Sequence, residues 1–315
     1  MIQSLLTPYL FQSAAQAITP ILLAALAGGL CGRVGVFNLA LEGQMLVGAF
    51  AAIVGSYFGH SALVGVAAAM AGAGAFSLIL AYGATTFRGD PVVIGIGMNL
   101  LASGLTAYLL RVIFGVSGTF SDPGVVGLGR VTIPMLLGVP VIGWAFARQS
   151  AVTWAAWALT ALISVVLFLT PIGLRMRGVG EQPDAASTLG VDVGRYRIAT
   201  VLVGGALAGL AGAQLSLAAV SVFSEDMSAG RGWIAVVAVM LGRNNPLYAA
   251  AACVLFGLAD AIAVNLQSRG LPNQLTDVAP YVATLVALVI THRRRIRATR
   301  LSGRPAPAET PEQRR

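Results

Sequence analysis

Long apolar stretches alternate with short polar segments along most of this chain. About 20 consecutive apolar residues are needed for a helix to cross a bilayer. Eight regions reach or approach that length and a ninth, shorter one follows, at residues 11–30, 35–57, 62–85, 91–114, 151–171, 198–222, 232–241, 246–266 and 278–290. Since the seventh region is too short for an ordinary span, the pattern predicts an all-α polytopic membrane protein with about eight to ten transmembrane helices, some of them discontinuous or re-entrant.

The composition supports this fold class. The chain has 57% hydrophobic residues, 10% charged residues and a mean hydropathy of +0.82, and a water-soluble domain with these values would expose large apolar patches. Residues 131–147 are apolar but interrupted by prolines, which favours an external or re-entrant element. Cys31 and Cys253 lie in apolar surroundings and indicate packing positions rather than a disulfide or a metal site.

The basic residues predict which side of the membrane each loop faces. The chain has no lysine, and its arginines gather at the ends of apolar regions and in the tail. Residues 178–190 form a polar island flanked by arginine on both sides, which places this loop in the cytoplasm and, traced backwards, the N-terminus outside. Residues 293–315 are basic and proline-rich, so we expect a disordered cytoplasmic tail that either attracts anionic lipids or only fixes the orientation.

A carboxylate lies within the second apolar region. An ionised side chain there costs roughly 2.5 to 3.5 kcal/mol, so Glu42 needs a partner or water. Asn38 precedes it by four residues, which would put both on one helical face, and Gln44 is nearby. The segment either presents a polar strip to a translocation pathway, or Glu42 accepts hydrogen bonds from backbone amides freed at Gly35 and Gly43.

Further candidates for a pathway lie in other apolar regions. Asn99, Asp260 and Asn265 are intramembrane polar groups, and each either lines a cavity or bonds between helices. Phe37 and Phe223 are the main aromatic side chains near these segments. Aromatic residues make up only 7% of the chain.

Two stretches, residues 25–52 and 206–236, resemble each other loosely, and each places glycine-bounded polar residues beside an apolar span. Paired interruptions of this kind often mark the discontinuous helices around a substrate path in transporters, although Ala/Gly-rich sequences also resemble one another by chance. Glu225, Asp226 and Arg231 flank the short seventh region. They form either the mouth of the pathway, where a soluble donor docks, or an external loop with a surface ion pair.

Several enzyme classes are excluded. The chain has no Walker phosphate loop, no Gly-x-Ser-x-Gly and only two histidines, far apart in sequence. Catalysis by this chain is therefore not expected, and any ATPase must be another subunit.

Four motifs follow one another along the chain: Gly-Arg-Val-Gly-Val-Phe-Asn-Leu-Ala-Leu-Glu-Gly at 32–43, Gly-x-x-x-x-Pro-Asp-Ala-Ala-x-x-x-Gly at 178–190, Ser-Glu-Asp-Met-Ser-Ala-Gly-Arg-Gly at 224–232, and Gly-Arg-Asn-Asn-Pro at 242–246. With them, residues 19–292 resemble the permease subunits of bacterial ABC importers of the branched-chain amino acid, ribose and nucleoside group. The chain looks most like the permeases for nucleosides and simple sugars.

This resemblance implies a permease domain over residues 1–292 in the bacterial plasma membrane. Its implied partners are a second homologous permease, an ATPase with two ATP-binding domains that are often fused, and a substrate-binding lipoprotein. No cofactor is implied in this chain, since ATP and magnesium bind the partner ATPase. Residues 175–197 are similar to the family's coupling loop, whose small side chains would let a short helix pack into a groove of the ATPase; the residues carried over are Gly178, Gly180, Glu181, Pro183, Asp184, Ala185, Ala186 and Gly190.

Three other functions stay open. The cargo can be a branched-chain amino acid rather than a nucleoside or sugar. The chain can also be an ion-coupled secondary transporter in which Glu42 and Asp260 are the coupling carboxylates. A membrane scaffold without transport would leave the paired polar interruptions unexplained.

Overall fold

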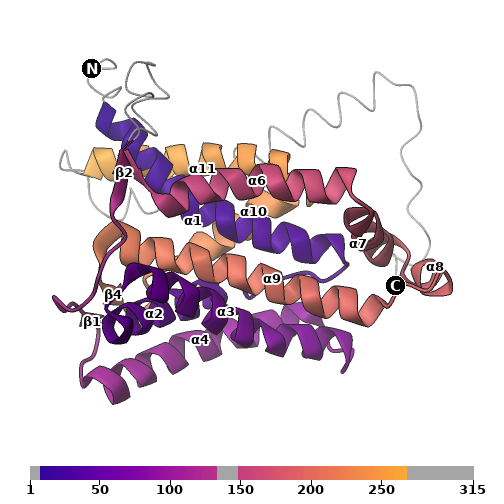
Figure 1. The fold of residues 1–315 in the computed structure, drawn as a ribbon, viewed down its shortest axis with the longest axis horizontal. Helices are drawn as coiled ribbons and strands as arrows, with labels where there is room; N and C mark the ends of the chain where they lie inside the picture. The colour runs from indigo at the N-terminus through magenta and orange to yellow at the C-terminus, as the bar shows by residue number, and fades with distance from the viewer. Residues whose placement is uncertain (1–7, 133–147, 268–315) are drawn as a thin grey trace, which may run out of the picture.

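The computed structural model describes residues 8–132 and 148–267, which form a bundle of helices with short strands at one end and a helical hairpin at the other (Figure 1). The elements are α1 (Pro8–Arg33), α2 (Leu41–Gly59), α3 (Ala62–Thr85), α4 (Pro91–Phe114), β1 (Thr119–Phe120), β2 (Arg130–Thr132), β3 (Arg148–Ser150), α6 (Ala151–Leu169), α7 (Pro171–Glu181), α8 (Pro183–Thr188), α9 (Val193–Ala213), η2 (Gln214–Val220), β4 (Phe223–Ser224), α10 (Arg231–Leu241) and α11 (Pro246–Gln267). We call the end with β1 and β4 the strand end, and the end with α7 and α8 the hairpin end.

The predicted spans agree with these helices in most places. Seven helices of the described ranges are long and apolar enough to cross a membrane, with the π-helical η2 continuing α9 as one span. The short seventh region is the 11-residue helix α10. The predicted span at 278–290, the tail at 293–315 and all but two residues of the 131–147 patch lie outside the described residues.

The second predicted span begins too early. We expected a helix from residue 35, but α2 starts only at Leu41, and residues 36–39 before it are neither helix nor strand. Hydropathy could not show this difference, because the extended segment carries as many apolar side chains as the helix that follows. The consequence is that polar residues at 38–44 lie around a helix start inside the bundle rather than along one continuous helix.

Helix α1 forms the centre of the bundle. Its residues 21–27 are almost completely buried, and it packs against α9, α10 and α11. Helices α2, α3 and α9 approach closely through small residues. A Cβ at Gly209 of α9 would collide with the carbonyl oxygen of Ala69, and one at Gly212 with that of Met45. Close backbone approach of this kind is typical of membrane helix packing.

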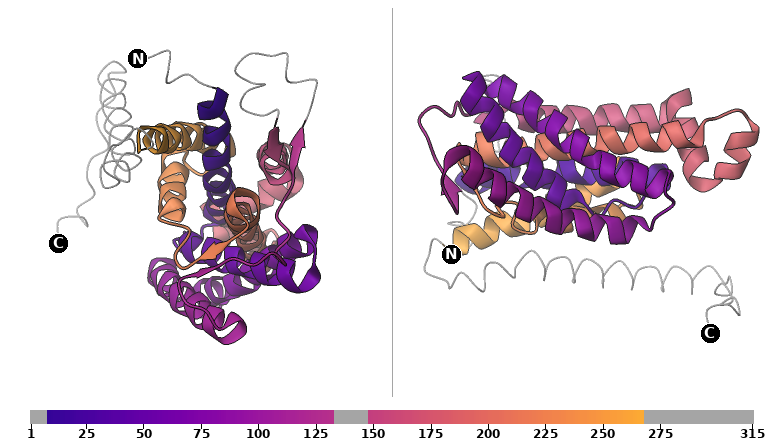
Figure 2. Two further views of the ribbon diagram at one scale, coloured as in Figure 1. Left: turned by 90° about the vertical axis from the view of Figure 1, so that its left-hand side faces the viewer. Right: turned by 90° about the horizontal axis from the view of Figure 1, so that it is seen from below.

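The two similar stretches have the same order of elements. α1 is followed by a short non-helical segment and α2, and α9 with η2 is followed by β4, a run of turn residues and α10. They run in opposite directions, since α1 ends beside the hairpin whereas α9 begins there (Figures 1 and 2). This inverted arrangement of broken helices is found around the binding sites of many transporters.

The strand end is closed by short antiparallel pairings. β1 pairs with β4, with Phe120 opposite Phe223, and β2 pairs with β3. Phe223 is fully buried there and packs edge-to-face against Phe50, with 5.3 Å between ring centroids. The loop that leads into α10 is therefore anchored at this end by a small aromatic core.

Candidate functional site

The polar island is a pair of short helices that extends beyond the bundle at the hairpin end (Figures 1 and 2). Pro171 opens α7, and the Thr170 hydroxyl accepts a hydrogen bond from the Gly173 amide at 3.3 Å, which caps the helix. Pro183 starts α8 after a single residue that separates it from α7. Gly190 follows α8 with φ of +79°, a conformation that suits glycine. Local sequence thus determines where each short helix begins and where the hairpin ends.

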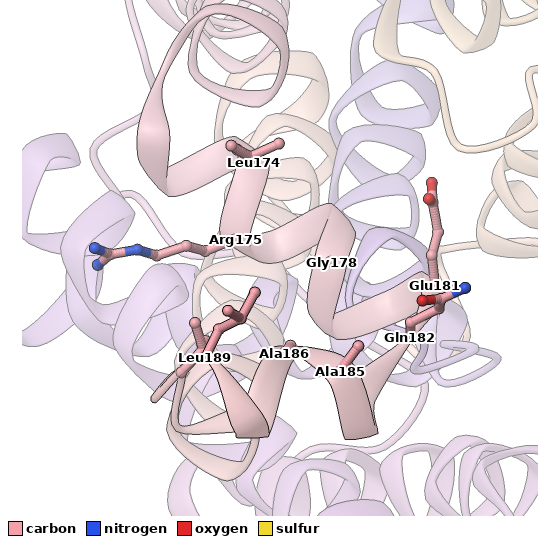
Figure 3. Close-up of a pocket in the computed structure, with 9 residues that line it drawn as sticks. Leu174, Arg175, Gly178, Glu181, Gln182, Ala185, Ala186 and Leu189 are labelled. Carbon is pink, nitrogen blue, oxygen red and sulfur yellow. The ribbon is translucent and has the colours of Figure 1, made fainter.

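A cleft of about 500 Å³ lies between the two helices (Figure 3). Arg175 and Glu181 lie at opposite ends of this cleft. Glu181, Asp184 and Ala185 are exposed. The cleft is lined by Leu174, Arg175, Gly178, Glu181, Gln182, Ala185, Ala186, Leu189 and Val191.

The two alanines of α8 differ in accessibility, and the covered one, Ala186, still lines the cleft. Its exposed fraction is only 7%, because α8 turns this residue toward the rest of the chain. Ala186 therefore seats the hairpin, while Ala185 faces outward. Sequence reasoning missed two exposed apolar residues of the cleft, Leu174 and Leu189, whose exposed fractions are 64% and 83%.

The hairpin is joined directly to the end of α1. A Cβ at Gly180 would collide with the carbonyl oxygen of Arg33, so the two backbones touch. Arg197 at the start of α9 donates from Nε to the Val34 carbonyl oxygen at 3.1 Å. Arg33 donates from Nε to the Asn244 carbonyl oxygen at 2.7 Å, which ties in the turn between α10 and α11. Sequence reasoning used these two arginines only for topology and missed these contacts.

Glu42, at the start of α2, is bonded to the start of α10. Its Oε1 accepts from the Gly230 amide at 2.8 Å and its Oε2 accepts from the Gly232 amide at 2.7 Å. These amides lie at the N-terminus of α10, where free N–H groups and the helix dipole favour an anion. Of the two interpretations of Glu42, the structure supports the one in which it satisfies backbone amides, but the amides belong to α10 and not to residues around 35 and 43.

Asn38 does not share a helical face with Glu42, because it lies in the extended segment before α2. Its Oδ1 accepts from the Ala40 amide at 3.0 Å and its Nδ2 donates to the Gln44 side-chain oxygen at 3.0 Å. The same-face prediction is therefore wrong, since the helix starts only after Asn38. These bonds instead fix the turn from extended chain into helix.

Asn99 connects α4 to the same place. Its Oδ1 accepts from the Gly43 amide at 2.8 Å, and its Nδ2 donates to the Leu39 carbonyl oxygen at 2.9 Å. Both bonds go to backbone groups that the start of α2 leaves without helical partners. Asn99 therefore ties α4 to the start of α2.

Asp260 and Arg231, which we expected in separate sites, form one ion pair. Arg231 Nη2 lies 3.8 Å from Asp260 Oδ2, and both side chains are largely buried between α10 and α11. Glu225 lies at the strand end, where its Oε1 accepts from the Gly118 amide at 3.0 Å. Asp226 follows it with φ of +53°. The expected surface ion pair within the 225–231 loop is therefore replaced by a pair inside the bundle.

The two aromatic candidates differ in accessibility. Phe37 has an exposed fraction of 38%, whereas Phe223 is fully buried in the aromatic core at the strand end. Only Phe37 of the two can therefore contact another molecule in this conformation.

A family model described as "Branched-chain amino acid transport system / permease component" matches residues 9–290. The chain belongs to this family. It is thus a multi-pass membrane permease component of an ABC importer and a non-catalytic subunit, in agreement with the resemblance of its motifs.

Individual permeases match over most of their length. The guanosine ABC transporter permease protein NupQ of Bacillus subtilis is 35% identical over 280 residues, which cover 85% of this chain and 87% of NupQ. The putative glucose ABC transporter permease protein TsgC13 of Haloferax volcanii is 34% identical, and the match covers 90% of this chain and 84% of TsgC13. The nucleoside permease protein NupC of Lactococcus lactis is 36% identical, with 86% and 88% covered. NupP, a second guanosine permease protein of Bacillus subtilis, is 28% identical, with 86% and 78% covered.

Proposed function

We propose that this permease passes nucleosides or simple sugars through the bacterial plasma membrane. The support is that relatives at 34 to 36% identity carry guanosine, nucleoside and glucose in their names. The family requires an ATPase and a binding protein, and the existence of both NupQ and NupP in one organism favours a second, related permease as the partner. In this assembly the chain supplies part of a gated route and hydrolyses nothing itself.

The hairpin α7–α8 is the proposed contact for the ATPase. The observation that carries this assignment is an open cleft of about 500 Å³ outside the bundle, with the apolar side chain of Leu189 exposed beside Glu181 and Asp184. An exposed apolar residue with polar neighbours is typical of a protein interface. ATP binding would close the ATPase dimer and push on residues 178–190.

Arginines near the hairpin end support an orientation of the permease in the membrane. Several arginines gather at the hairpin end, in α7, at the start of α9, at the end of α1 and in the turn between α10 and α11. They are Arg33, Arg175, Arg177, Arg195, Arg197 and Arg243. The positive-inside rule therefore places the hairpin end in the cytoplasm. The strand end then faces the binding protein, with Glu225 and Asp226 in its surface loop, while Arg231 belongs to the bundle.

A continuous set of contacts leads from the hairpin to the starts of α2 and α10. Gly180 touches the end of α1, and the extended segment that starts there leads to Glu42. Glu42 in turn holds the first amides of α10. A push on the hairpin would therefore shift the starts of α2 and α10 together and switch the route between inward and outward opening.

Within the proposed route the polar candidates have different tasks. Phe37 is accessible and is our candidate for contact with cargo. Asn38, Asn99 and Glu42 shape the helix start through their hydrogen bonds. Asp260 neutralises Arg231, and this ion pair would keep α10 and α11 together during the switch.

Uptake by cells that lack the native gene tests this function. Cells complemented with the wild-type chain should accumulate radiolabelled guanosine or glucose, and Glu181→Arg should abolish uptake while the chain still co-purifies with its sister permease. Arg88→Glu, a charge reversal in the loop between α3 and α4, is the control and should transport normally. Full uptake by Glu181→Arg would contradict the ATPase contact, and uptake of neither cargo by the wild type would contradict the substrate class.

A further inference from the structure

A second hollow lies on the outer surface of the bundle, between α6 and α9, with α1 as its floor and α7 at one end. Its volume is about 360 Å³. Almost all of its surface is apolar, and Val203 and Leu162 at its rim have exposed fractions of 54% and 56%. It is lined by Leu30, Leu159, Leu162, Ile163, Val166, Ile172, Met176, Tyr196, Ala199, Thr200, Val203 and Leu207.

The length of this groove corresponds to one leaflet. On α9 its lining runs from Tyr196 to Leu207, which at 1.5 Å per residue is roughly 16 Å. Half of a bilayer's hydrocarbon core is about 15 Å thick. A helix segment 10 to 12 Å wide and of this length would occupy more than about 1,000 Å³, several times the volume of the groove. The groove therefore fits an extended acyl chain better than a helix of another subunit.

The mouth of the groove is polar and cationic. The Tyr196 hydroxyl lies there and accepts a hydrogen bond from Nη1 of Arg175 at 3.4 Å. This hydrogen bond raises the pKa of Arg175, which stays charged. In the described part of the chain Arg175 has no carboxylate at ion-pair distance, whereas nearby Arg195 is paired with Asp192 at 3.0 Å. The exposed guanidinium of Arg175 can therefore bind an anion at the mouth, whereas that of Arg195 is already paired with a carboxylate.

We infer that the α6–α9 groove binds an anionic phospholipid of the leaflet at the hairpin end. One acyl chain lies in the groove, and the headgroup phosphate accepts hydrogen bonds from Arg175 and Tyr196. A phosphate suits this position because guanidinium groups bind it through charge-assisted hydrogen bonds. Since Arg175 also lines the hairpin cleft, the bound lipid would brace α7 against α9 next to the proposed ATPase contact.

Photo-crosslinking of the full chain tests this site. The chain is reconstituted into nanodiscs of phosphatidylcholine and phosphatidylglycerol, with a diazirine on the acyl chain of one lipid at a time, and adducts are mapped by peptide mass spectrometry. Labelled phosphatidylglycerol should mark the groove faces of α6 and α9, and labelled phosphatidylcholine should mark them much less. Arg175→Gln should lower the phosphatidylglycerol adducts about fivefold, the effect of one basic residue at an anionic membrane surface. Arg195→Gln should leave them unchanged.

A second pair of variants tests the groove without changing any charge. Val203→Trp fills the groove and should remove the adducts, whereas Val165→Trp, on a neighbouring exposed face of α6, should keep them. Both positions are exposed, so neither change disturbs the core. Equal labelling by both lipids, unchanged adducts in Arg175→Gln, or groove adducts with a protein subunit instead of lipid in the purified complex would each overturn the proposal. None of these outcomes depends on which cargo is carried.

Discussion

Removal of the Glu42 carboxylate should destabilise the bundle, because two backbone amides of α10 would lose their acceptor. Glu42 accepts from the amides of Gly230 and Gly232 at 2.8 and 2.7 Å. Hydrogen bonds to a charged group contribute roughly 1.5 to 3 kcal/mol each, and Glu42 is partly exposed, so the lower value is appropriate. Glu42→Ala should therefore cost roughly 3 kcal/mol. For a chain of 315 residues that is a fall in Tm of roughly 4 to 5 °C.

Glu42→Gln separates charge from shape. A glutamine keeps one acceptor oxygen, but its amino group would face the second backbone N–H. We expect roughly half the effect, a fall in Tm of about 2 °C. The measurement is the loss of the monodisperse peak in size-exclusion chromatography after heating the full chain in mild detergent.

Glu181→Ala is the matched control, since Glu181 is an exposed acid on α7. Its Tm should stay within about 1 °C of the wild type. If Glu42→Ala kept the wild-type Tm and yet lost uptake, the carboxylate would act on the cargo or on an ion, and the structural role assigned to it would be refuted.

Three further results are expected. Asn99→Ala should lower the Tm by several degrees, since two backbone groups at the start of α2 lose their partner; an unchanged Tm would mean that water replaces the amide. Gly180→Val should abolish uptake although the chain still inserts, because a branched side chain cannot fit against the backbone of Arg33; normal uptake would disprove the close contact. Asp260→Asn should impair uptake and stability, and Arg231→Gln in the same chain should restore part of the stability, as a double-mutant cycle would show; additive losses would mean that the pair is not coupled.

The sequence was sufficient to predict elements that depend on local pattern. The spans, the short helix α10 and the polar hairpin all follow from apolar length, proline and glycine, because membrane helices satisfy their backbone hydrogen bonds within the segment. Pro171, Pro183 and Gly190 mark the hairpin in the sequence itself.

Contacts between distant segments could not be predicted in this way. The start of α2 at Leu41 depends on Asn99, and Glu42 depends on amides of α10 that lie far away in the sequence. The hydropathy of a residue does not depend on its hydrogen-bond partner, so it cannot show that Asn99 and Glu42 bond to distant segments. Likewise, the pattern gave no reason to separate Ala186 from Ala185, because a helix of six residues is too short to show which face is buried.

The most direct test of the account is a photo-reactive amino acid at Ala185 of the full chain in its native membrane. Ala185 is exposed on the hairpin, so irradiation should yield a covalent adduct that mass spectrometry identifies as the ATPase subunit. The same probe at Asp226, at the strand end, should yield no ATPase adduct. An ATPase adduct from Asp226 and none from Ala185 would contradict both the assignment of the hairpin and the orientation of the permease.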